Sequence, residues 1–364
     1  MSGSTLYYLF FIIVIYLSLP LSQKKLHDFY KSITTLKSNT YEVDNPLLNN
    51  NNISPSIELN ELNSYNSISS SNSIKENQNL LDMCKLTNLR NLMLSSNQLT
   101  GSITKTIGNL INLNILNIAE NKLIGTIPSE IGKLSSLIIF NVSHNELIGT
   151  ISKGIEKLKN LKTLDLNKNK FSGTIPQSIY LLSNLITFSV SSNKLTGIIP
   201  KSIGKLRNLT TLNFDNNKLN GSILTNIRQL TNLITFDISH NKLTGNIPKK
   251  IGSLINLNVL NFEKNQLNES IPASISELTN LTNFNVSFNK LTGTIPTSIG
   301  QLSKLIDFDI SSNKFTGSLP SEICNISTLK VLKLNNNNFI CYPLCLFQID
   351  NIHKDIDNDV NICD

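Results

Sequence analysis

Histidine is the side chain best suited to proton transfer near neutral pH, and the chain has four: His27, His144, His240 and His353. None of them stands at a spacing to Ser, Cys, Asp or Glu that is typical of a nucleophile and its base. The sequence also lacks a phosphate-binding loop and a dinucleotide fingerprint. We therefore predict no catalytic residue, no cofactor and no enzymatic activity.

Three alternating acids near the end, Asp355, Asp357 and Asp359, resemble the start of a calcium-binding loop. A calcium loop needs a glycine next and a glutamate later, and this segment has neither. We predict no metal site there.

Lysine is the source of much of the net charge of +7. One set of lysines recurs at multiples of 24 residues: Lys122, Lys170, Lys194, Lys218, Lys242, Lys290 and Lys314. A row spaced in this way is typical of a solvated edge, and attraction to an acidic polymer is the alternative. We predict no nucleic-acid partner, because the charge is a spaced row rather than a patch.

The positions of these lysines follow a repeat that organises most of the chain. Its clearest marker is a column of asparagines 24 residues apart: Asn97, Asn121, Asn145, Asn169, Asn193, Asn217, Asn241, Asn265, Asn289, Asn313 and Asn337. Apolar columns keep the same phase. Eleven 24-residue units predict a solenoid, in which each unit buries its apolar face against its neighbours. The asparagine amides are expected to form a ladder of hydrogen bonds between coils.

One unit shows how each coil is built. Alternation around Leu116 and Ile118 predicts a short strand with both side chains inward. Gly125 permits a backbone that a side chain would obstruct, and the residues before Pro128 favour an extended chain. Apolar residues three apart then predict a short helical turn. Successive strands should align in parallel at about 4.8 Å, so the coils form an arc roughly 50 Å long.

The unit LxxLxLxxNxLxGxIPxxIGxL, nearly complete in Leu281 to Leu302, resembles the plant-type extracellular leucine-rich repeat. Polygalacturonase-inhibiting proteins and the ectodomains of leucine-rich-repeat receptor kinases carry this unit. The resemblance implies a right-handed α/β solenoid whose parallel β-sheet lies on the concave face. Glu269 departs from the pattern by replacing the glycine, and Thr104, Ser152 and Leu224 replace the proline, so we expect irregular coils there.

A ligand of such a solenoid would contact the outward residues of the strands. We select eight candidates: Asp165, Asn213, Asp237, Asn261, Phe288, Asp309, His144 and His240. The two histidines share one repeat position but stand four coils apart, about 19 Å, which is too far for a common catalytic site. The column is small and polar, and such amide and carboxylate rows suit a peptide backbone or a hydroxyl-rich glycan; equally, they keep a sheet soluble.

The segments outside the repeats suggest a domain order. We assign residues 1–22 to a signal peptide, or alternatively to an anchor through residues 6–21, and we expect no other membrane span. Residues 23–79 are a low-complexity arm that we expect to be poorly ordered. Residues 80–88 form an N-terminal cap, residues 89–340 the repeat domain, and residues 341–364 a Cys-containing cap and tail.

The chain has five cysteines. Cys84 and Cys324 are ten coils apart, about 48 Å, and cannot pair. Cys324 and Cys345 should lie on adjacent coils, so we favour a disulfide between them. The segment Cys341 to Cys345 also resembles the terminal cap of the family, which implies a Cys341–Cys345 bond instead. An odd number leaves at least one thiol free or in a bond between molecules.

Asn-X-Ser/Thr sequons are as frequent as chance allows in a chain so rich in Asn, Ser and Thr, so their number is no argument for secretion. The glycosylation candidates in the repeats are Asn141, Asn208, Asn220, Asn268, Asn280, Asn285 and Asn325. Asn141 and Asn285 belong to the outward strand column, where glycans would obstruct the concave face.

We expect a non-catalytic recognition solenoid, secreted or at the cell surface, that binds a protein or polysaccharide on its concave face. Two alternatives stay open. One is a structural or adhesive component of a cell coat, assembled through the free thiol. The other is an inhibitor of a secreted wall-degrading enzyme, which rests on the resemblance alone.

Overall fold

The fold is seen in a computed structural model that describes residues 67–69, 84–350 and 352–363. The segments predicted as signal peptide or anchor, and most of the predicted arm, lie outside the described residues. All of the described residues belong to one compact unit, Leu59–Asp364. Among them, no helix is long and apolar enough to cross a membrane.

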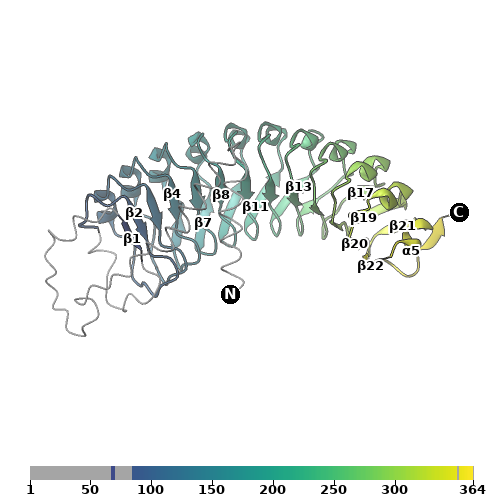
Figure 1. The fold of residues 1–364 in the computed structure, drawn as a ribbon, viewed down its shortest axis with the longest axis horizontal. Helices are drawn as coiled ribbons and strands as arrows, with labels where there is room; N and C mark the ends of the chain where they lie inside the picture. Colours follow the sequence, from purple (N-terminus) through teal and green to yellow (C-terminus); the bar gives the residue numbers. More distant parts are fainter. Residues whose placement is uncertain (1–66, 70–83, 351, 364) are drawn as a thin grey trace, which may run out of the picture. The chain divides into compact units, whose positions relative to one another are not determined.

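A long parallel sheet lines the inner side of the arc (Figure 1). Each strand pairs with the strand 24 residues later in the repeats, as Leu116 pairs with Phe140, so equivalent positions lie directly across from each other. The strands of this first sheet are β1 (Ser67–Ser69), β2 (Asn91–Met93), β3 (Ile115–Asn117), β4 (Ile139–Asn141), β6 (Thr163–Asp165), β8 (Thr187–Ser189), β10 (Thr211–Asn213), β12 (Thr235–Asp237), β14 (Val259–Asn261), β16 (Asn283–Asn285), β18 (Asp307–Asp309), β20 (Val331–Lys333) and β22 (His353–Asp355).

Two further parallel sheets follow the turn of each coil. The second sheet contains β5 (Ile148–Thr150), β7 (Lys170–Thr174), β9 (Lys194–Ile198), β11 (Lys218–Ser222), β13 (Lys242–Gly245) and β15 (Gln266–Leu267). The third contains β17 (Thr292–Gly293), β19 (Lys314–Ser318), β21 (Asn338–Pro343) and β23 (Asn361–Cys363). The two sheets separate between β15 and β17, at the coil where Glu269 replaces glycine and takes its left-handed conformation, with φ +61°.

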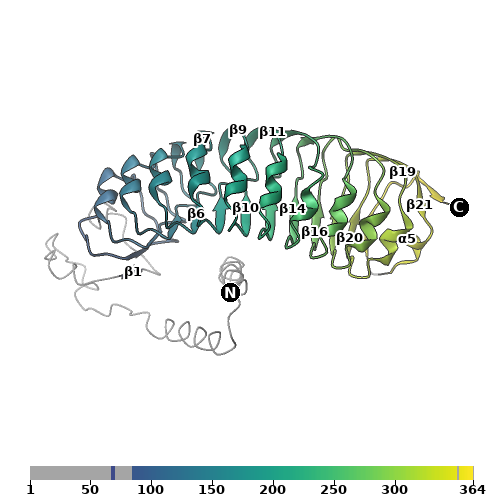
Figure 2. The ribbon, with the colours of Figure 1, turned by 90° about the horizontal axis from the view of Figure 1, so that it is seen from above.

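Short 3-10 helices close the outer side of the coils, where Figure 2 shows them side by side. They are η1 (Lys105–Asn109), η2 (Ser129–Lys133), η3 (Lys153–Lys157), η4 (Gln177–Leu181), η5 (Lys201–Lys205), η6 (Thr225–Gln229), η7 (Ile251–Ser253), η8 (Ala273–Glu277), η9 (Thr297–Gln301) and η10 (Ser321–Asn325); a single helical turn, α5 (Cys345–Gln348), follows the last coil. Thr104, Ser152 and Leu224 precede η1, η3 and η6, which form like the others. The irregularity predicted at these three coils is therefore wrong.

The interior is a continuous apolar column. Leu116, Ile118 and Ile131 have no exposed surface, and equivalent residues of the other coils are buried in the same way. Phenylalanines alternate between two inward positions in the middle coils, so that Phe188 meets Phe214 edge to face with ring centres 5.0 Å apart. The alternation places one large ring beside another without two competing for the same space.

The asparagine ladder predicted from the sequence is present. In a typical coil the Asn193 Nδ2 group donates to the carbonyls of Leu166, Val190 and Ser191 at 2.9 to 3.0 Å, and its Oδ1 accepts from Phe171 N at 3.0 Å. Two of these four partners belong to the preceding coil. One side chain thus bonds to backbone groups of two coils, and successive ladder asparagines share carbonyls, as Asn193 and Asn217 share Val190 O.

A second, outer row of asparagines was not predicted. Asn160, Asn184 and Asn208 each donate one hydrogen bond to a carbonyl 25 residues earlier, at 2.9 to 3.0 Å. This outer row makes one bond per side chain on an exposed edge, where water competes, so we expect it to contribute less to stability than the inner ladder.

The C-terminal coil is closed by the acidic tail and by two disulfides. The carboxylate of Asp357 accepts hydrogen bonds from Asn336 N at 2.9 Å and from Asn337 N at 3.4 Å, which is the place that a further coil would fill. Cys324 is bonded to Cys345, as the spacing favoured. Cys341 is bonded to Cys363 rather than to Cys345, because β23 pairs with β21 and places Pro343 opposite Cys363.

The ladder can be tested by replacing Asn193 with alanine. We expect the variant to lose about 1 to 3 kcal/mol of unfolding free energy, because Phe171 N loses its acceptor and the carbonyls of Leu166, Val190 and Ser191 each lose one of two donors. Denaturant unfolding measures the loss. Asn208→Ala is the matched control, since it removes one exposed bond; an equal loss in the two variants would contradict the special role of the inner ladder.

Replacing Tyr180, unlike replacing Asn193, should raise the unfolding free energy. Its side chain is fully buried and its hydroxyl has no hydrogen-bond partner. Because an unpaired buried hydroxyl is destabilising, Tyr180→Phe should raise the unfolding free energy by about 1 kcal/mol. A lower denaturant midpoint in the variant would show that the hydroxyl is bonded in solution.

Candidate ligand-binding site

The concave face is formed by the two outward residues of each short strand and by the turn that follows. In β12 the middle residue, Phe236, is buried, while Thr235 and Asp237 face outward. The turn then places one residue per coil in the left-handed region, such as His240 with φ +51°. Backbone hydrogen bonds between coils hold this conformation, as His240 N donates to Glu263 O at 2.8 Å.

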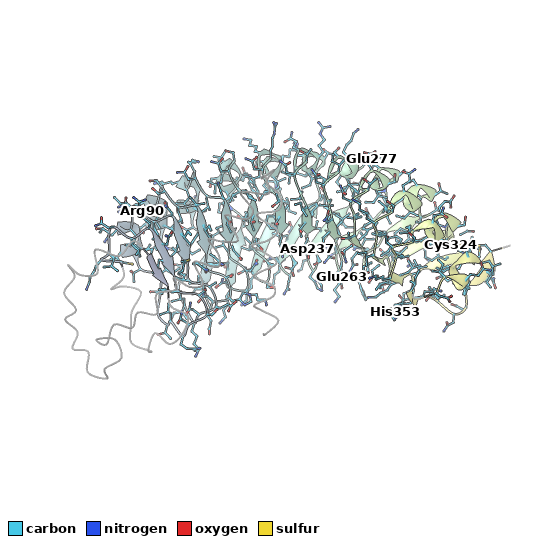
Figure 3. All side chains as sticks on the ribbon, viewed as in Figure 1. Arg90, Asp237, Glu263, Glu277, Cys324 and His353 are labelled. Carbon is cyan, nitrogen blue, oxygen red and sulfur yellow. A yellow bond between two sulfur atoms is a disulfide. The ribbon has the colours of Figure 1, made fainter. Side chains whose placement is uncertain are left out.

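Polar and charged side chains from adjacent coils meet on this face in what we term the central polar cluster: Asp215, Asp237, His240, Asn261, Glu263, Lys264 and Asn285. The Asp237 Oδ2 atom accepts from Asn261 Nδ2 at 3.1 Å. Glu263 accepts from Asn285 Nδ2 at 3.4 Å and lies 3.9 Å from His240 Nε2 and 3.6 Å from Lys264 Nζ. Figure 3 shows Asp237 and Glu263 on the inner side of the arc.

Phe288 borders this cluster and supplies an apolar surface. Its ring is half exposed, and the Lys264 Nζ atom stands 5.4 Å from the ring centre. The cluster therefore combines carboxylates, an ammonium and an aromatic face within neighbouring coils.

The carboxylates of the cluster are partly withdrawn from water. Burial raises the pKa of Asp215, and the nearby charge of Asp237 raises it further. Burial also raises the pKa of Asp237, while hydrogen bonds from Ser239 and Asn261 lower it. Carboxylates in this situation gain from a cationic ligand, because a positive group replaces the water that they have lost.

The structure brings together four of the eight candidates, which are Asp237, His240, Asn261 and Phe288. Asn213 adjoins them and accepts a hydrogen bond from Asp215 N at 3.1 Å. His144 and Asp165 lie on earlier coils, and Asp309 lies on a later coil, 3.5 Å from Lys333 Nζ. Ligand binding at all eight remains a prediction.

Sequence reasoning missed Asp215, Glu263 and Lys264. Their signal was their position: Asp215 and Glu263 come two residues after the outward strand column, and Lys264 comes three residues after it. Both positions face the same side as the column. Within the described residues, no group of His, Cys, Asp and Glu could hold a metal ion.

The sequons differ in how accessible they are. Asn208, Asn220, Asn268 and Asn325 are exposed, whereas Asn280 and Asn285 are half-buried. Asn141 is only 9% exposed, and its Oδ1 accepts from Ser143 N at 3.0 Å. We therefore expect Asn141 to be a poor acceptor of a glycan, and use of any sequon stays a prediction.

Comparisons with known proteins match this architecture. A family model described as "Leucine-rich repeat region" matches residues 143–246, and one described as "Leucine Rich Repeat" matches residues 88–110, 112–134, 280–302 and 304–326. A comparison with the curated proteins found no match.

Three solved structures are similar over most of the described chain. The plant peptide hormone receptor RGFR1, in complex with RGF2, is 38% identical with a TM-score of 0.69 and covers 72% of this chain. The Arabidopsis receptor kinase HAESA, with the peptide hormone IDA and the co-receptor SERK1, is 31% identical with a TM-score of 0.67 and covers 81%. The Leptospira interrogans leucine-rich-repeat protein LIC12759 is 35% identical with a TM-score of 0.63 and covers 76%.

The share of each solved structure that this chain covers also differs. This chain spans 42% of the first receptor and 54% of the second, and 70% of the Leptospira protein. The similarity to the two receptors therefore concerns the repeats rather than the whole receptor.

Asp165 gives a test of the electrostatics of this face. Burial raises its pKa from 3.8 to about 6, although a hydrogen bond from Asn167 N opposes the shift. Because the folded pKa lies above the unfolded value, protonation of Asp165 stabilises the fold at low pH, and this contribution is lost as the pH rises through about 6. Asp165→Asn should therefore be more stable than the natural protein at about pH 7.5, with the difference shrinking toward about pH 4.

Denaturant midpoints of the two proteins across this pH range measure the effect. A difference that does not change with pH would contradict the raised pKa of Asp165.

Proposed function

The chain belongs to the leucine-rich-repeat family, and we propose that it is a non-catalytic recognition solenoid that binds an extended peptide, or a segment of a partner protein, along its concave face. The observation that carries this proposal is the central polar cluster, in which side chains of adjacent coils converge on one open surface. The peptide hormone receptor RGFR1 in complex with RGF2, and HAESA in complex with the peptide hormone IDA, support a protein ligand.

The chemistry of the cluster favours a peptide that carries Lys or Arg. Three carboxylates, Asp215, Asp237 and Glu263, outnumber the two lysines that act on them, which are Lys264 beside Glu263 and Lys168 near Asp215. Phe288 beside the cluster offers an apolar contact, and aromatic side chains are common anchors in protein interfaces. Outward amides such as Asn261 and Asn285 can bond to an extended peptide backbone.

A secreted or cell-surface location fits this function. Two disulfides close the C-terminal cap, and disulfides persist in oxidising compartments. The similar structures include the Arabidopsis receptor kinase HAESA and its leucine-rich-repeat ectodomain. Residues 1–22 would act as a signal peptide, or residues 6–21 as an anchor.

The alternatives have less support. Assembly of a cell coat through a free thiol would need an exposed cysteine, but Cys84 is 1% exposed and the other four cysteines are paired. Inhibition of a wall-degrading enzyme has no residue in the described part of the chain that favours it.

A displayed library of random peptides tests the proposal. The full chain is the bait, and Asp237→Asn combined with Glu263→Gln is the counter-bait. We expect peptides enriched in Lys and Arg to bind the natural protein and to lose at least about tenfold in affinity for the double variant, because two of the three central carboxylates lose their charge.

The matched control combines Glu130→Gln with Glu156→Gln, which removes two carboxylates from the outer helices η2 and η3. It should bind the selected peptides as the natural protein does. Failure to enrich any peptide, or equal binding by the Asp237→Asn, Glu263→Gln variant, would overturn the proposal.

A further inference from the structure

We propose that the second sheet is a separate binding face for a linear polysaccharide that carries carboxylate groups. This face lies on β7, β9, β11 and β13, away from the strands that form the concave face. It is independent of the peptide-binding proposal and uses different residues.

The charge of this face is positive and largely uncompensated. Lys170, Lys194, Lys218 and Lys242 begin the four strands, and all are exposed. Lys170 is paired with Glu146 at 2.9 Å, whereas the other three have no ion pair in the described part of the chain. The four strands contain no Asp or Glu. Three neighbouring ammonium groups are thus free to bind anions.

The register of this sheet determines the spacing of the lysines. In the first sheet residue i pairs with residue i+24, but here the shift is 22, so that Lys218 lies opposite Thr196 and Lys242 opposite Asn220. Each lysine is therefore displaced by two residues along the strand from the lysine of the preceding coil. With strands about 4.8 Å apart and about 3.3 Å per residue, successive lysines are roughly 8 Å apart on a diagonal line.

Residues with hydroxyl or amide groups lie between successive lysines on this face. Going across the strands, Lys218 is followed by Thr196 and Thr174, and Lys242 by Asn220 and Ile198. The Thr196 hydroxyl donates to Gly173 O at 3.2 Å, which leaves its oxygen lone pairs to accept from a ligand. A single line of charges with hydroxyls beside it matches a sugar chain that has carboxylates at intervals and hydroxyls between them.

Exposed isoleucines on the same face are explained by this ligand. Ile198 is 57% exposed and Ile148 is 48% exposed, although both are outward residues of a polar sheet. Ile148 lies directly across from Lys170. The C–H faces of sugar rings can pack on such side chains while the carboxylates meet the lysines.

The same residues argue against a nucleic acid. The four strands carry no arginine, whose planar fork suits phosphate, and no outward aromatic residue on which a base could stack. Lysine is a compact point charge that suits a carboxylate equally well.

Binding of polygalacturonate, measured by calorimetry with the full chain, tests the proposal. The protein is secreted into a bacterial periplasm, which allows disulfides but leaves Asn220 without a glycan. We expect binding that weakens with salt, and a loss of at least about tenfold in the triple variant Lys194→Gln, Lys218→Gln, Lys242→Gln.

The matched control is Lys133→Gln, Lys157→Gln, Lys205→Gln, which removes the same charge from the ends of η2, η3 and η5. It should retain binding. No binding by the natural protein, an equal loss in both triple variants, or equal affinity for double-stranded DNA of similar length would overturn the proposal. Circular dichroism verifies that both variants are folded.

Discussion

The structure depends on pairing the backbone groups that each coil leaves free where it leaves the first sheet. An asparagine amide can donate and accept at once, and it reaches both its own turn and the preceding coil. No purely apolar residue could do this in a buried position, and an aspartate would lack the donor. The repeat length must therefore be constant, because each coil must present the amide at the same place as its neighbour. The apolar core then forms because stacking superimposes the inward columns.

The two sheets of each coil pair in different registers, which spaces equivalent residues differently. Direct pairing in the first sheet keeps equivalent residues close on the concave side, whereas the two-residue displacement in the second sheet moves them farther apart. The concave face therefore brings side chains of neighbouring coils within hydrogen-bonding distance, as in the contact between Asp237 and Asn261. The flank instead spreads its lysines. Equivalent side chains of neighbouring coils are therefore close together in the first sheet and more widely spaced in the second sheet.

Features that recur every 24 residues could be predicted from the sequence. Features that depend on contacts between different repeat positions could not. The inward leucines, the ladder and the Cys324–Cys345 bond follow from phase alone. The bond of Cys341 to Cys363 could not be predicted, because it depends on a return strand that has no repeat marker. Strand β1 lies in the segment expected to be a poorly ordered arm: Ile68 keeps the phase of Leu92, but Ser73 stands where the ladder asparagine is expected. The central polar cluster was only half predicted, since Glu263 joins it from a position outside the column considered.

The residue before each ladder asparagine can vary without disturbing the coil. Ser, Glu, His, Lys, Asn and Phe all occur there with the same left-handed backbone, at Ser96, Glu120, His144, Lys168, Asn216 and Phe288 among others. That conformation is maintained by main-chain bonds and by the following asparagine, so the side chain itself is not needed to build the coil. Each coil therefore has one surface position that accepts different side chains. Substitutions along this row could change ligand specificity without disturbing the fold.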